Sequence, residues 1–175
     1  MTKHKITVLD YAKMIEVKNQ IQRKAIEAVL NELNLCDAEK RKAKAILNLA
    51  TGVGKTRTAW KLAFENGSYN TILFMVPKQS LVDQTIEEWL DLGITFDYCT
   101  VYTSGNVKSV EELNAFLETT SNNKKVVFAV YNSVGVSPDR DSIFSMCDHE
   151  FDIAIYDECH RVAGKDMGLF TSCVT

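Results

Sequence analysis

Apolar residues along the chain fall alternately into helix-like and strand-like segments. They recur at helical spacing in four segments, which begin near residues 19, 56, 80 and 109. Shorter apolar runs stand among them, at residues 45–49, 71–76, 96–102, 125–130 and 151–156. Several of these runs are apolar without alternation, which is typical of strands buried on both faces of a parallel sheet. The order predicts a doubly wound parallel α/β sheet with helices on both faces.

The first predicted helix begins at Asn19. Its apolar residues share one face because three or four positions separate them: Ile21, Ala25, Ile26, Val29, Leu30 and Leu33. Ahead of it, Ile6 and Val8 alternate only loosely, so the first ten residues are predicted to be an edge strand or extended, and residues 1–18 are assigned to an N-terminal leader. Residues 19–175 are predicted to form one domain, since 175 residues with 46% hydrophobic composition suffice for one full core and are few for two.

Composition excludes several classes of protein. No run approaches the roughly 18 apolar residues of a membrane span, and no basic leader precedes an apolar stretch as in a secretory signal. The five cysteines are odd in number and scattered, which favours reduced thiols in an intracellular protein. We expect a cytoplasmic location, and a bacterial, phage or other viral origin is compatible with it. Zinc is a weak alternative, because neither Cys147 nor Cys159, each close to a histidine, has the spacing of a ligand pair.

The net charge of -3 hides an asymmetry along the chain. Residues 1–70 carry 13 Lys plus Arg against 7 Asp plus Glu, whereas residues 71–175 carry 7 against 16. A polyanion would therefore meet a basic first half and an acidic second half. The basic cluster at residues 40–44 is most simply explained as a solvated helix end.

Residues 49–56, Leu-Ala-Thr-Gly-Val-Gly-Lys-Thr, carry the strongest chemical signal. They lie between an apolar run and a helix-like segment, which predicts a strand, a turn and a helix. A loop with Gly52 and Gly54 can turn its backbone N–H groups inward, and the helix that follows adds the positive end of its dipole. Lys55 would reach the β and γ phosphates of ATP, and the Thr56 hydroxyl would bind Mg²⁺.

This loop departs from the strict P-loop pattern, which has glycine in place of Leu49. Ala-Thr-Gly-X-Gly-Lys-Thr after an apolar residue resembles motif I of superfamily 2 helicases and translocases, especially the branch with the motor subunits of type I and type III restriction enzymes. The resemblance covers about residues 15–165 and implies the first RecA-like ATP-binding domain of such a motor. It also implies nucleotide contacts along the loop, from Thr51, Gly52, Val53, Gly54, Lys55, Thr56 and Arg57. The simpler alternative is a glycine-rich turn with an exposed lysine.

Residues 22–26, Gln-Arg-Lys-Ala-Ile, resemble the Q-motif region of the same superfamily. The resemblance implies that the Gln22 amide reads the edge of adenine, although Ile21 stands where the family often has an aromatic residue. A local alternative remains open, because Asn19 and Gln22 also have the spacing of a capping box.

Two further segments resemble motifs that hold the nucleic-acid backbone. Residues 76–84 are similar to motif Ia, where a lysine, hydroxyls and free N–H groups suffice for phosphate contact, although any strand-to-helix turn has a similar pattern. Residues 130–133, Val-Tyr-Asn-Ser, are similar to motif Ib, with valine in place of the usual threonine. The resemblance implies nucleic-acid contacts from Pro77, Lys78, Ser80, Tyr131 and Ser133.

A pair of acidic residues follows the last apolar run, at Asp157 and Glu158. The end of a parallel strand places both at the edge where such sheets bind ligands. Asp157 would hold Mg²⁺ and Glu158 would orient and deprotonate the attacking water. Asp-Glu-Cys-His resembles motif II, a variant of the DEAD and DEAH boxes, and implies that His160 senses the γ-phosphate. The simpler alternative is an exposed acidic loop.

These residues together predict an ATP- and Mg²⁺-dependent helicase or translocase domain. We expect it to act on DNA or RNA within the full-length protein, and we expect no membrane partner. A translocase subunit of a restriction or defence system that moves on duplex DNA without separating strands is an alternative. A P-loop ATPase or kinase that does not act on nucleic acid is another. An interaction module with a vestigial nucleotide site is the non-enzymatic alternative, against which the intact Lys55, Thr56, Asp157 and Glu158 argue.

The chain is also predicted to be truncated before motif III. No Ser-Ala-Thr or Thr-Ala-Thr tripeptide stands between Arg161 and Thr175. We therefore expect the parent protein to continue with such a tripeptide and a second RecA-like domain that supplies an arginine to the site. The isolated segment is accordingly expected to hydrolyse ATP at a negligible rate.

Overall fold

The computed structural model describes residues 8–39, 45–65, 69–131, 143–144 and 146–158. The chain divides into two compact units, residues 1–67 and 68–175, which are described one at a time. No helix in the described ranges is both long enough and apolar enough to cross a membrane.

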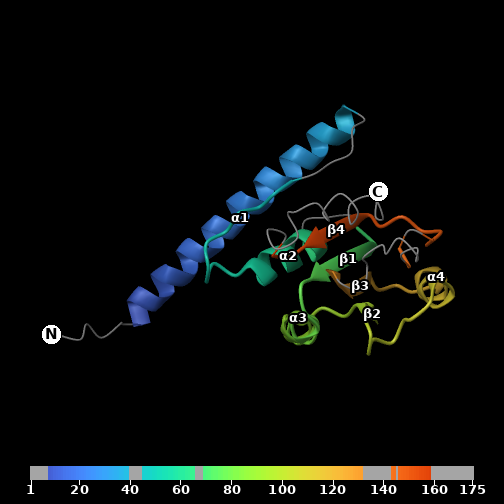
Figure 1. Ribbon diagram of the computed structural model, residues 1–175. Helices are drawn as coiled ribbons and strands as arrows, with labels where there is room; N and C mark the ends of the chain where they lie inside the picture. The colour runs from blue at the N-terminus through green and yellow to red at the C-terminus, as the bar shows by residue number, and fades with distance from the viewer. Residues whose placement is uncertain (1–7, 40–44, 66–68, 132–142, 145, 159–175) are drawn as a thin grey trace. The chain divides into compact units, whose positions relative to one another are not determined.

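The first unit contains helix α1 (Val8–Ala38) and helix α2 (Lys55–Phe64) (Figure 1). Helix α1 begins at Val8 rather than at Asn19, so residues 8–18 are helical and the predicted leader or edge strand is wrong over that range. The spacing of Tyr11, Met14 and Ile15 already continues the helical pattern towards the N-terminus. Asn19 consequently lies inside a helix, where it cannot serve as an N-cap.

The strand predicted at residues 45–49 is absent from the described structure, which has neither helix nor strand from residue 45 to residue 50. An apolar run becomes a strand only where a neighbouring strand supplies ladder hydrogen bonds, and composition alone does not provide that neighbour. The turn and the helix predicted after this run are both present.

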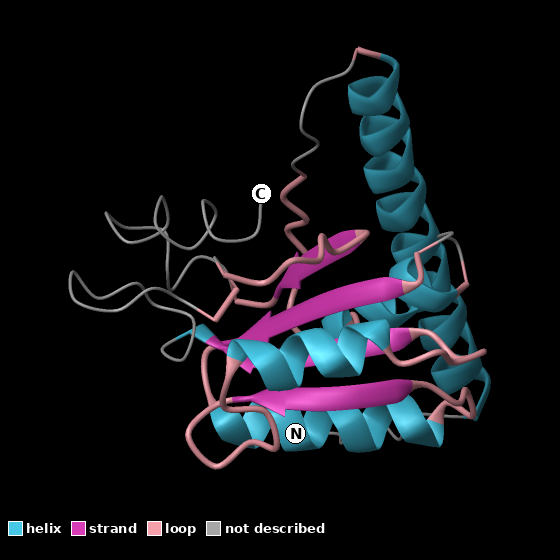
Figure 2. Cartoon of the chain, turned by 90° about the vertical axis from the view of Figure 1, so that its right-hand side faces the viewer, coloured by secondary structure: helices cyan, strands magenta, loops and turns pink. Residues whose placement is uncertain are grey.

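The second unit is built on a parallel sheet of four strands: β1 (Thr71–Val76), β2 (Asp97–Val101), β3 (Lys125–Val130) and β4 (Ile153–Tyr156). The order across the sheet is β2-β3-β1-β4, and the strands point the same way in Figure 2. Two helices complete the unit, α3 (Gln79–Asp91) and α4 (Val110–Glu118). The predicted parallel α/β fold is confirmed.

The two helices of this unit cover opposite faces of the sheet. The chain moves away from β1 to reach β2 and then steps back to β3, and right-handed crossovers in opposite directions place their helices on opposite faces. From α3, the Trp89 ring packs against Phe74 and Phe128, with ring centroids 5.0 and 5.5 Å apart. From α4, Leu113 and Leu117 pack in the other core cluster, among residues such as Leu73.

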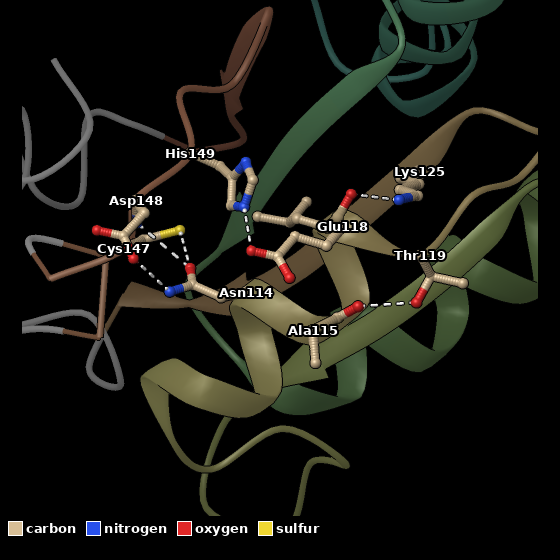
Figure 3. Close-up of polar contacts among 9 residues, drawn as sticks. Asn114, Ala115, Glu118, Thr119, Lys125, Cys147, Asp148 and His149 are labelled. Atoms are coloured by element: carbon tan, nitrogen blue, oxygen red, sulfur yellow. Dashed lines mark hydrogen bonds and ion pairs between the residues drawn. The ribbon is translucent and has the colours of Figure 1, made fainter.

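Polar contacts tie α4 to the segment that leads into β4 (Figure 3). The Asn114 side chain donates to Asp148 Oδ2 at 3.0 Å and accepts from the Cys147 thiol at 3.2 Å. Burial raises the pKa of the Cys147 thiol, which keeps it protonated as a donor. His149 Nε2 lies 3.5 Å from Glu118 Oε1. These contacts help to fix where β4 starts.

Asp152 sets the register of β4 against the central strand β1. Its Oδ2 atom accepts hydrogen bonds from the main-chain N–H groups of Asn70 (2.6 Å) and Thr71 (2.8 Å), at the start of β1. Met75 consequently pairs with Tyr156 at the other end of the two strands. The residue after Tyr156 therefore stands at the carboxyl edge of the sheet.

The aromatic cluster under α3 is expected to dominate the stability of this unit. Trp89 is fully buried, so Trp89→Ala should lower the free energy of unfolding by about 3–5 kcal/mol. Leu90→Ala is the control, because Leu90 is 45% exposed and adjacent on the same helix. Urea denaturation of both variants measures the difference, and equal losses would contradict the assignment of Trp89 to the core.

Candidate functional site

The candidate phosphate loop, residues 49–54 of the first unit, leads into the N-terminus of α2. Gly54 is the N-cap residue, with φ 92° and ψ 61°, and Gly52 has φ 82°. These left-handed conformations are costly for residues with a Cβ, which explains glycine at both positions. The Val53 N–H donates to the Ala50 carbonyl at 3.3 Å and closes the turn, which also includes Thr51.

The start of α2 suits a bound anion. Its first turn contains no acidic residue, and no side chain caps it. The first hydrogen bond of the helix runs from the Thr58 N–H to the Gly54 carbonyl at 2.9 Å, and the positive end of the helix dipole lies at this terminus. A Cβ at Gly52 would meet nothing within 4 Å, so the loop is open on that side. Lys55 and Thr56 begin the helix beside this loop, and the donor set fits a polyphosphate.

Gln22 of α1 lies against the phosphate loop. Its Nε2 atom donates to the Val53 carbonyl at 2.7 Å, its side chain is 3% exposed, and its buried Oε1 atom has no hydrogen-bond partner. A Cβ at Gly54 would lie 2.9 Å from Gln22 Nε2, which is a second reason for glycine there. The capping-box alternative is wrong, because Gln22 bonds to the loop and Asn19 lies inside the helix.

Thr58 supports the N-cap residue of α2, a role that the sequence analysis did not predict. Its hydroxyl donates to the Gly54 carbonyl at 2.9 Å, alongside the backbone bond to the same oxygen. The signal was a threonine four positions after the N-cap glycine, because a helical hydroxyl commonly bonds to the carbonyl four residues back.

The acidic pair of the second unit forms a hydrogen-bonded turn at the carboxyl end of β4. The Asp157 N–H donates to the Met75 carbonyl of β1 at 2.9 Å, and the Asp157 carbonyl accepts from the Tyr131 hydroxyl at 2.7 Å. The Glu158 N–H donates to Asp157 Oδ1 at 3.0 Å. Glu158 has φ 53°, a conformation that costs a non-glycine residue about 1–3 kcal/mol. The surrounding contacts therefore hold a strained backbone in place.

The predicted nucleic-acid contacts of motif Ia follow β1, the strand beside β4, and so lie at the same edge of the sheet as the acidic pair. Lys78 is the exposed N-cap residue of α3, Ser80 is exposed, and Pro77 is partly buried. The next residue, Gln79, donates to Ser104 Oγ at 2.7 Å and ties this corner to the loop after β2.

The structure gives Tyr131 a location that the sequence did not predict. Its side chain is 2% exposed and belongs to the core cluster under α4, which does not fit a direct nucleic-acid contact. Ser133 and His160 lie outside the described residues. Among the described residues, no group of three or more histidine, cysteine or acidic side chains could hold a metal ion by itself.

The amino-acid sequence of this chain matches that of a known protein family. Residues 16–172 match the family described as "Type III restriction enzyme, res subunit". A probable helicase of African swine fever virus is 32% identical over 128 residues in a Kenyan pig isolate and 31% identical over 137 residues in a South African tick isolate. Each alignment covers 72% of this chain but 15% of the viral protein, so the chain spans a small part of these relatives.

A solved structure has the same fold. It is a nuclease-deletion mutant of the type ISP restriction-modification enzyme LlaGI in complex with a DNA substrate mimic. The TM-score is 0.59 with 22% sequence identity, over 80% of this chain and 15% of that chain. The resemblance to superfamily 2 motors is thereby confirmed, and the chain belongs to the family of the type III restriction enzyme res subunit.

Proposed function

We propose that this chain is the ATP-binding, first RecA-like domain of an ATP-dependent nucleic-acid helicase or translocase. The observation that carries the proposal is the phosphate loop. In it, two glycines in left-handed conformations lead into a helix that has no side-chain cap and begins with Lys55 and Thr56. The membership of the chain in a restriction-motor family supports the same function. The viral relatives that are named probable helicases support it as well.

The chain supplies distinct groups for phosphoryl transfer. Lys55 and the loop from Thr51 to Arg57 bind the phosphates. The Gln22 amide would read the adenine edge after it exchanges its hydrogen bond to the Val53 carbonyl for one to the base. Bound Mg²⁺ would neutralise charge on the β and γ phosphates, and Thr56 and Asp157 would hold it. Glu158 orients the attacking water and accepts its proton.

Other groups would couple this chemistry to movement. His160 would sense the γ-phosphate, and Lys78 with the hydroxyls of Ser80 and Ser133 would contact the nucleic-acid backbone beside Pro77. A second RecA-like domain of the full-length protein would complete the site with an arginine.

A duplex-DNA translocase that does not separate strands is the second candidate. Two observations favour it: the restriction-enzyme family match and the LlaGI structure, which was determined with a DNA substrate mimic. An ATPase without a nucleic-acid substrate has no such support.

ATP hydrolysis by the full-length protein tests the proposal. We expect the rate to rise several-fold with nucleic acid, and a comparison of duplex DNA, single-stranded DNA and RNA identifies the substrate. Stimulation by duplex DNA with displacement of a third strand but no unwinding would select the translocase. A measurable ATPase rate that none of the three nucleic acids changes would contradict the proposal.

A further inference from the structure

We propose that Tyr131 is a positioning residue, which sets the orientation of the Asp157–Glu158 turn through its hydroxyl group. The inference rests on the proposed function, in which these two carboxylates act on metal and water. It assigns Tyr131 a role inside the protein instead of a contact with nucleic acid.

The peptide group between Asp157 and Glu158 is held on both sides. Its carbonyl oxygen accepts from the Tyr131 hydroxyl at 2.7 Å, and its N–H donates to Asp157 Oδ1 at 3.0 Å. A peptide group is planar, so fixing its oxygen and its N–H fixes its plane. The next rotatable bond is the one described by φ of Glu158, which is 53°. The direction in which the Glu158 side chain leaves the backbone therefore depends on this plane.

The Tyr131 ring is itself well placed to hold the turn. It is 2% exposed and lies in the core cluster with Met75 and Ala129. It also stacks on the ring of Tyr156, the residue before the turn, with centroids 6.4 Å apart and planes 7° apart. A hydroxyl on a fixed ring constrains its acceptor more than a hydroxyl on a mobile side chain would.

Tyr131 also joins two segments that are distant in the sequence. It directly follows β3, and the main chain of Asp157 is held on its other side by Met75 of β1. The turn is thus supported by the two strands β1 and β3 in addition to its own strand β4.

Tyr131→Phe in the full-length protein tests this role, because it removes the hydroxyl and keeps the ring. We expect kcat for ATP hydrolysis to fall about five-fold, the factor that corresponds to one hydrogen bond, with the Kd for nucleotide unchanged. Tyr102→Phe is the matched control: it removes a hydroxyl that donates to Asp83 at 3.3 Å, away from the turn, and should leave kcat unchanged.

Hydrogen exchange gives a second readout that does not need activity. The Glu158 amide should exchange faster in Tyr131→Phe than in the wild type or in Tyr102→Phe, because the peptide plane loses one of the two hydrogen bonds that hold it. Unchanged exchange, or faster exchange with an unchanged kcat, would overturn the inference. If the wild-type protein has no ATPase activity and the Glu158 amide still exchanges faster in Tyr131→Phe, the result would support the positioning role and overturn the proposed function.

Discussion

We expect Mg-ATP to raise the melting temperature of this protein, and we expect Lys55→Ala to abolish that stabilisation. A ligand that binds only the folded state raises the free energy of unfolding by about 2.7 kcal/mol at one hundred times its Kd. Lys55 is the first residue of α2, and the motif brings its ammonium group to the β and γ phosphates. Its loss removes the positive charge that compensates these phosphates most directly, and the backbone donors and the helix dipole are weaker substitutes.

Lys61→Ala is the matched control for that experiment. Lys61 lies on the same helix, in its last turn, and its replacement removes the same charge from the opposite end of α2. Thermal melts with and without saturating Mg-ATP should show the full shift for the wild type and Lys61→Ala, and none for Lys55→Ala. An undiminished shift in Lys55→Ala would place the nucleotide elsewhere.

The sequence predicted most of the sheet because burial and local pattern agree there. The runs at residues 71–76 and 125–130 are apolar without alternation, and both are central strands of the structure. Helix α4 begins where the helical spacing starts near residue 109, and its N-cap Ser109 accepts from the Glu112 N–H at 3.2 Å. In these elements the local signal and the tertiary environment favour the same conformation.

The predictions failed where a partner distant in sequence decides the outcome. Asn19 and Gln22 have capping-box spacing, but the start of the helix lies earlier and the Val53 carbonyl takes the Gln22 amide. The similarity to motif Ib implied that Tyr131 contacts nucleic acid at the surface. Its side chain is instead buried by strands and a helix that are distant in the sequence, which no local pattern reveals. Spacing identifies residue types that suit a chemistry, whereas tertiary packing decides what each side chain touches.

Glu158→Gln should leave nucleotide binding intact and reduce ATP turnover by the full-length protein roughly 10²- to 10⁴-fold, the usual contribution of a general base. Glutamine has nearly the same shape as glutamate and keeps the backbone N–H that donates to Asp157 Oδ1, so the strained turn should persist. What disappears is the carboxylate that would accept a proton from water.

Glu150→Gln is the control for this variant, because Glu150 is exposed and precedes β4 at the other end of the strand. Turnover and the nucleotide-dependent melting shift should be measured on both proteins. A loss of binding together with turnover in Glu158→Gln would mean that the carboxylate supports the turn rather than the water. Unchanged turnover would assign proton transfer to another group, because no neutral amide can act as a base of the required strength. Retained binding with lost turnover is the result expected of a carboxylate that acts on the attacking water.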